Sequence, residues 1–133
     1  VVYIANPLFR SYAQDGYGVY KAVVGELLRK LLPAPAVIAP ALPSTARVTL
    51  FVQGARAVAH ILYYPLTRRA PDIDIIEEPG LPENIELRVR LENPPSRVAL
   101  APQNTAVPFR FENGYAVCRL ARVPGHQAVS FEP

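Results

Sequence analysis

Four carboxylates, Asp72, Asp74, Glu77 and Glu78, form the only acidic cluster in the sequence. Glycoside hydrolysis requires two carboxyl groups that face each other across a cleft, one protonated and one ionised. Asp72 and Asp74 would project together from one side of an extended strand, and nothing around them favours a protonated form. A calcium site completed by loop carbonyls is an alternative use of these oxygens. We interpret the cluster as a solvated strand edge that discourages aggregation.

The two histidines are the candidates for general-base catalysis. His60 is expected opposite Thr49 on the mixed face of a hairpin, where we interpret it as a hydrogen-bonded structural residue. His126 follows Pro124-Gly125 in a turn, where its ring is expected to bond a backbone carbonyl. A general base needs an oriented partner in a cleft, and zinc needs further ligands at suitable spacing. We therefore predict no metal site and no cofactor.

Nucleophilic side chains are few. Cys118, the single cysteine, falls on the apolar face of its strand, which indicates a buried and unreactive thiol. Ser44, Thr45 and Ser130 have no base near them in sequence, and no G-x-S-x-G motif is present. We predict no catalytic residue in this chain. A lone cysteine cannot form an internal disulfide, which favours a reducing compartment such as the cytoplasm.

An aromatic group offers the best candidate for ligand binding. Tyr63 and Tyr64 follow His60 closely, and with Phe51 and Arg68 they would form a platform on which a sugar ring stacks. We favour the simpler interpretation, in which one tyrosine lies in the core and the other on the rim.

The overall composition is that of a soluble globular domain, with 133 residues, 50% hydrophobic and 19% charged. The net charge of +3 comes from basic and acidic residues that are interleaved, which argues against a nucleic-acid partner. No apolar run approaches the roughly 18 to 20 residues that span a bilayer, and no signal peptide is recognisable. Because the chain opens on Val1 and contains no methionine, we expect it to be a piece of a longer protein.

The stretch 46–64 carries the clearest fold signal. Gly54-Ala55 suits a type II′ turn, which pairs Val52 with Ala57 and continues the ladder toward Arg47 and Tyr64. One side of this hairpin is wholly apolar and the other is mixed, so turn chemistry and burial agree on one register. We expect the hairpin to form the centre of an antiparallel sheet.

Further period-2 runs follow the hairpin, each bounded by proline, glycine or asparagine. Asn113-Gly114 predicts a second hairpin, with Phe109 and Phe111 on the same face as Cys118. The predicted strands are 72–78, 84–92, 97–101, 107–112, 115–120 and 127–132. Seven or eight short strands at this spacing indicate a mainly β fold, an antiparallel β-sandwich, with a partly open barrel as the alternative.

The N-terminal part differs in period. Residues 1–5 resemble a strand, and an amphipathic helix follows that Pro33 ends. We divide the chain into a strand-loop-helix segment (1–33), a proline-rich connector (34–43) and the sandwich (44–133). The apolar stripe of the helix is wider than packing on one partner requires, so we expect it to form an interface. Its residues are Tyr20, Val24, Leu27, Leu28 and Leu31.

Several short sequence segments, in their order along the chain, resemble the C-terminal end of bacterial glycosyl hydrolases related to the β-galactosidases. These segments are Pro7-Leu8-Phe9, Tyr12, YKAVVGELLRKLLP, LPSTARVTL, HILYYP, RVALAPQ and GHQAVSFE. The resemblance implies that 1–32 is the last strand and helix of a trimerisation-type α/β domain and that a terminal β-sandwich follows. It also implies that the catalytic glutamates belong to a barrel upstream, because no residue here matches them.

Two functions follow from the resemblance. The first is a non-catalytic structural module that helps to assemble a sugar-cleaving enzyme, with the rest of that enzyme and further copies of it as partners. The second is a carbohydrate-binding module that presents aromatic side chains. Rings of Tyr63, Tyr64 and Tyr115 that are exposed and coplanar would favour the second function, and rings that are packed individually would favour the first.

Overall fold

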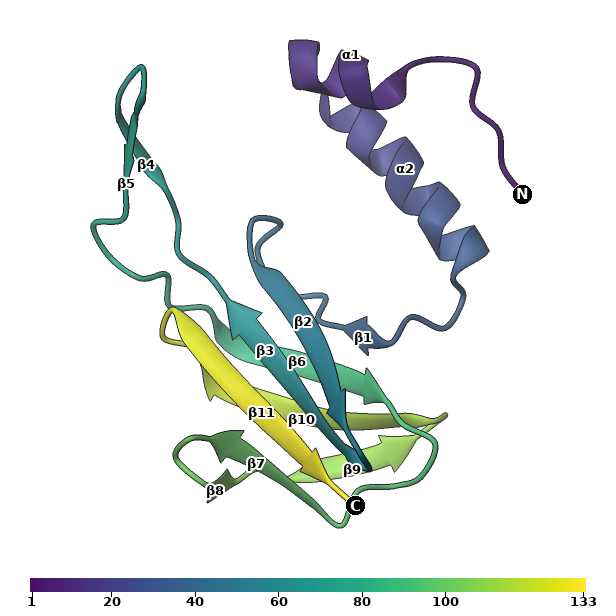
Figure 1. The fold of residues 1–133 in the computed structure, drawn as a ribbon, viewed down its shortest axis with the longest axis vertical. Helices are drawn as coiled ribbons and strands as arrows, with labels where there is room; N and C mark the ends of the chain where they lie inside the picture. The colour runs from purple at the N-terminus through teal and green to yellow at the C-terminus, as the bar shows by residue number, and fades with distance from the viewer. The chain divides into compact units, whose positions relative to one another are not determined.

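The computed structural model describes all residues from Val1 to Pro133, which form two compact units, Val1–Pro35 and Ala36–Pro133. The first unit contains two helices and the second contains all the strands (Figure 1). Neither helix is long and apolar enough to cross a membrane.

The first unit consists of α1 (Leu8–Asp15) and α2 (Gly18–Leu31). Helix α1 ends where Gly16 adopts φ +67°, and the Gly16 N–H donates to the carbonyl of Tyr12 at 2.9 Å. This left-handed ending suits glycine, which has no Cβ to clash. Helix α2 ends before Pro33, with basic residues in its last turn where the helix dipole favours cations. The amphipathic helix expected from the sequence is therefore present.

The segment before α2 differs from the prediction. Residues 1–5 form no strand, and much of the expected loop is helix α1. A strand needs a neighbour for its backbone hydrogen bonds, and no strand of this chain pairs with residues 1–5. Apolar character at the N-terminus was therefore not sufficient to form a strand here.

The second unit is an antiparallel β-sandwich, which confirms the predicted fold class. The five-stranded sheet has the order β2-β3-β11-β7-β8, and the four-stranded sheet has the order β1-β6-β10-β9. The strands of the first are β2 (Arg47–Gln53), β3 (Arg56–Leu62), β11 (His126–Glu132), β7 (Arg97–Ala101) and β8 (Thr105–Ala106). Those of the second are β1 (Val37–Ile38), β6 (Glu83–Arg90), β10 (Tyr115–Arg122) and β9 (Phe109–Glu112).

The core lies between the two sheets. Alternate residues of each strand face inward, so one apolar cluster is built from both inner faces. Phe131 of β11 is its largest fully buried side chain and is 1% exposed. The other fully buried members include Ile61 and Val129 from the five-stranded sheet and Ile85, Leu87 and Val89 from β6.

Both predicted hairpin registers are confirmed. Val52 pairs with Ala57 across a turn in which Gly54 has φ +60°. In the second hairpin Asn113 and Gly114 have φ +50° and +78°, the two positive values that a type I′ turn requires. Phe111 then pairs with Ala116, as expected from the sequence.

The place of the first hairpin in its sheet was predicted wrongly. Strand β2 is the sheet edge, and β11 pairs on both sides, with β3 and β7. The apolar side of the hairpin is not completely covered, and Val52, near the turn, is 70% exposed. The sequence shows that β2 and β3 pair, but the closing strand is more than 60 residues away along the chain.

Three other segments differ in detail. The predicted strand 72–78 shortens to β5 (Ile73–Ile75), which pairs with the unpredicted β4 (Thr67–Ala70) in a two-stranded hairpin (Figure 1). The predicted strand 107–112 begins only at Phe109, and the short β8 precedes it. The proline-rich stretch 34–43 contains β1, where Val37 pairs with Val89.

Candidate functional site

A row of three rings crosses the outer face of the five-stranded sheet. The β3–β11 register pairs His126 with Leu62 and Ala128 with His60, which makes the two histidines diagonal neighbours. Their rings are nearly parallel, at 5° with centroids 5.4 Å apart. Phe51 meets the His60 ring edge-on at 5.5 Å and 88°. We call Phe51, His60 and His126 the ring row.

The two imidazoles are hydrogen-bonded to each other, with Nδ1 of His60 3.1 Å from Nε2 of His126. One ring must donate a proton and the other must accept it. His60 lies opposite Thr49 and is hydrogen-bonded, as expected. The prediction for His126 was wrong, because this residue begins β11 and its ring bonds His60 instead of a carbonyl. Each imidazole therefore has the other as its hydrogen-bond partner.

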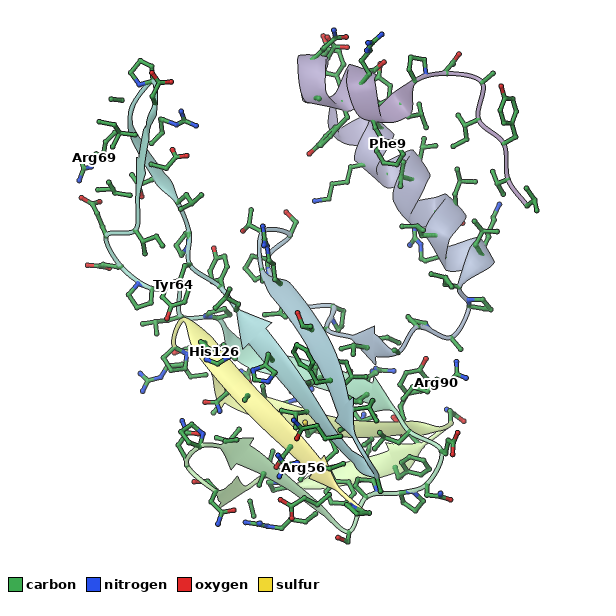
Figure 2. The ribbon with its side chains drawn as sticks, in the orientation of Figure 1. Phe9, Arg56, Tyr64, Arg69, Arg90 and His126 are labelled. Atoms are coloured by element: carbon green, nitrogen blue, oxygen red, sulfur yellow. The ribbon has the colours of Figure 1, made fainter.

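The two tyrosines considered for a sugar platform make separate contacts. The ring of Tyr63 packs over Gly80, where an added Cβ would clash with ring atoms Cδ1 and Cε1. The ring of Tyr64 packs over Gly125, where an added Cβ would lie 2.6 Å from Cζ. Tyr64 lies near His126 at the start of β11 (Figure 2). Tyr115 is half-buried on β10, where it pairs with Arg90 and Glu112.

Arg68 is occupied elsewhere. It lies on the β4–β5 hairpin, where its Nε is 2.6 Å from a carboxylate oxygen of Asp74. Arg69 of β4, labelled in Figure 2, forms an ion pair with Glu77, which follows β5. The acidic cluster is thus partly neutralised by neighbouring arginines. No group of three or more His, Cys, Asp or Glu side chains lies close enough to hold a metal ion.

A cluster of charges that sequence reasoning missed occupies the outer face of the four-stranded sheet. We call Glu86 and the three guanidinium groups around it, those of Arg88, Arg110 and Arg119, the arginine cluster. Arg88 Nη2 lies 2.6 Å from Glu86 Oε1, whereas Arg110 and Arg119 lie 3.7 Å and 3.6 Å from Oε2. The hydrogen bond from Arg88, together with the charges of all three arginines, lowers the pKa of Glu86.

The sequence pattern indicated only part of the arginine cluster. The alternation of β6 showed that Glu86 and Arg88 face outward. Their encounter with Arg119 and Arg110 depends on two further pairings, β6 with β10 and β10 with β9. Only the second of these followed from a local turn.

Cys118 and Gln127 are polar or reactive side chains that lie buried in the sandwich. Cys118 is 2% exposed, as expected, and burial raises the pKa of its thiol to about 11. Gln127, which the sequence analysis did not single out, is 4% exposed and faces inward beside Ile61. Its amide donates to the carbonyl of Ala101 at 3.1 Å and to Gln103 at 3.2 Å, which satisfies it in the core.

Comparison with known proteins gives results for solved structures alone. No family model matches the chain, and no curated protein sequence matches it. The fold does match α-L-fucosidase isoenzyme 2 from Paenibacillus thiaminolyticus, with a TM-score of 0.91 and 30% identity over 98% of this chain. The matched protein is a glycoside hydrolase. This chain spans only 20% of the length of that fucosidase.

A second solved structure shares the fold more distantly. It is a cycloisomaltooligosaccharide glucanotransferase from a Paenibacillus species, with a TM-score of 0.54 and 16% identity. The match covers 72% of this chain and 16% of the glucanotransferase chain. At this identity the likeness concerns the fold only.

Proposed function

We propose that this chain is a non-catalytic accessory module of a glycoside hydrolase, located at the C-terminal end of its parent. The observation that carries the proposal is the fucosidase match, in which 98% of this chain corresponds to 20% of a hydrolase chain. A segment of that size, with both units included, is consistent with a module that accompanies a catalytic domain. The catalytic carboxylates would then lie in the remainder of the parent.

The sugar that the parent enzyme hydrolyses is a more specific proposal. The sequence resemblance indicated a parent related to the β-galactosidases, whereas the matched solved structure is a fucosidase. We therefore propose α-L-fucoside hydrolysis as the activity of the parent, with galactoside hydrolysis as the alternative.

The charges support a non-catalytic role. A glycosidase general acid has a raised pKa, because it must be protonated before it donates its proton. For Glu86 the hydrogen bond from Arg88 and the charges of the surrounding arginines instead lower the pKa. Asp74 and Glu77 form ion pairs with Arg68 and Arg69.

The packing of the tyrosines also favours the structural role over a carbohydrate-binding platform. Coplanar exposed rings would be required for the platform, but Tyr63 and Tyr64 pack individually on Gly80 and Gly125. As partners we propose the remainder of the parent enzyme and further copies of it. The apolar stripe of α2 supports this proposal, since Leu28 and Leu31 are 50% and 49% exposed.

A direct assay tests the proposal. The purified 133-residue chain is incubated with aryl α-L-fucosides and aryl β-galactosides, and no release of the aryl group is expected. Glu77→Gln and Asp74→Asn serve as control variants, since these residues belong to the only acidic cluster of the sequence. Turnover that survives repurification and is lost in either variant would contradict the proposal.

A further inference from the structure

We propose that the outer face of the four-stranded sheet binds the sulfate or carboxylate groups of an acidic polysaccharide. The polysaccharide class rests on the proposed function, whereas the preference for an anion rests on the arginine cluster itself.

The face has more positive than negative side chains. The β6–β10 and β10–β9 registers place four arginines and two glutamates on it. These are Arg88, Arg90, Arg110, Arg119, Glu86 and Glu112. The excess positive charge of this one face is most of the net +3 of the chain. A surface of this kind attracts anions and holds them more tightly at low salt.

Glu86 contacts the three arginines around it unequally. Arg88 holds Oε1 of Glu86 through both Nε and Nη2, at 2.8 Å and 2.6 Å. Arg110 and Arg119 share Oε2 at 3.7 Å and 3.6 Å, which is longer than a good hydrogen bond. Arg110 is also paired through Nε with Oε1 of Glu112 at 3.1 Å, whereas Glu86 is the only carboxylate within 4 Å of Arg119. The guanidinium fork matches carboxylate and sulfate oxygens well. An anionic group between Arg110 and Arg119 would therefore gain contacts that Glu86 provides only weakly.

The face is poor in exposed apolar groups, which disfavours a protein partner. Large exposed apolar side chains of the second unit, such as Phe51, Val52 and Ile73, belong to other strands, and none belongs to β1, β6, β9 or β10. Protein interfaces have an apolar core rich in aromatic residues. Single-stranded nucleic acid is recognised on rows of exposed aromatic rings, and this face has only the half-buried Tyr115. A hydrophilic polyanion fits these features better.

Binding of dextran sulfate to the 133-residue chain tests the proposal, with unmodified dextran as the neutral probe. Titration at low salt is expected to show binding of dextran sulfate that weakens as salt rises, and no binding of dextran. Arg110→Gln and Arg119→Gln are each expected to weaken binding roughly fivefold, the order of one exposed charge contact. Glu86→Gln is expected to strengthen binding by a similar factor, because it removes the competing carboxylate.

Arg47→Gln is the matched control. It removes the same charge from an exposed residue on the five-stranded sheet, and less than a twofold change is expected. An equal loss in Arg47→Gln would show that only net charge matters and would overturn the proposal. Weaker binding in Glu86→Gln would overturn it too. Tighter binding of a single-stranded DNA oligonucleotide than of dextran sulfate would assign the face to nucleic acid instead. None of these outcomes affects the hydrolysis assay, so the two proposals fail separately.

Discussion

Nδ1 of His60 lies 3.1 Å from Nε2 of His126, although the two residues are 66 positions apart in sequence. The contact joins β3 to the start of β11 and lies on the outer face of the five-stranded sheet. It replaces the carbonyl-bonding interpretation of His126 and supplies the hydrogen-bond partner that was expected for His60.

Mutation of either histidine is expected to cost similar stability. His60→Ala and His126→Ala should each lower the free energy of unfolding by about 1 kcal/mol, the usual net value of one hydrogen bond. The double variant should lose less than the sum of the two, because each single change already breaks the shared contact. Urea denaturation of the three variants measures the coupling. Strict additivity would show that the rings do not interact in solution.

Gly80 and Gly125 are expected to respond differently to alanine substitution. Gly80→Ala places a Cβ inside the ring of Tyr63, and no positive φ is involved, so Tyr63→Ala should rescue most of the loss. Gly125→Ala meets the ring of Tyr64 and also strains a backbone with φ +68°. Tyr64→Ala should therefore rescue it only in part, leaving about 1 kcal/mol of strain. Thermal unfolding of the two double variants makes the comparison, and equal rescue would contradict it.

The buried thiol of Cys118 predicts a pH dependence. Burial raises its pKa from 9.0 to about 11, so the folded state keeps a proton that the unfolded chain begins to lose above about pH 9. The stabilising contribution is therefore complete below pH 9 and is lost as pH rises from 9 to 11. Chemical denaturation across this range should show a steeper decline for the natural chain than for Cys118→Ala. Parallel curves would mean that the thiol is accessible, as would rapid alkylation of the folded protein at pH 8.

Helix α2 predicts self-association of this chain in solution. Its apolar stripe has no fully buried member, and Leu28 is 50% exposed. Exposed apolar patches of this kind tend to acquire a partner, most simply a second copy related by a two-fold axis. Sedimentation at micromolar concentration should show a dimer that Leu28→Lys dissociates. Ala22→Lys, on the opposite face of α2, is the control and should leave the dimer intact. A monomer in all three chains would contradict the prediction.

Local chemistry was sufficient for several parts of the fold. Gly54-Ala55 and Asn113-Gly114 set their hairpin registers from the sequence, because a two-residue turn and a period of two leave one arrangement that buries the apolar side. The burial of Cys118 followed from the same alternation. Helix α2 was predictable from its 3.6-residue period and from Pro33.

Strand order and cross-strand neighbours required the tertiary structure. The sequence did not indicate that β11 would separate β3 from β7, so neither the edge position of β2 nor the His60–His126 contact could be predicted. The sequence identified Tyr63 and Tyr64 as neighbouring aromatic residues. It did not predict which residues their rings contact, because the glycines against which they pack lie outside the hairpin.

The charged residues also show what the sequence predicted and what required the tertiary structure. Along the chain the basic and acidic residues are interleaved, and from that pattern the sequence alone predicted ordinary solvated faces. Pairing of β6, β9 and β10 brings Arg88, Arg110 and Arg119 around Glu86. Turn geometry and periodicity act over a few residues, so the sequence by itself determined the hairpins. Which strands become neighbours depends on how all the apolar faces are buried together, so only the tertiary structure decided where the arginines gather.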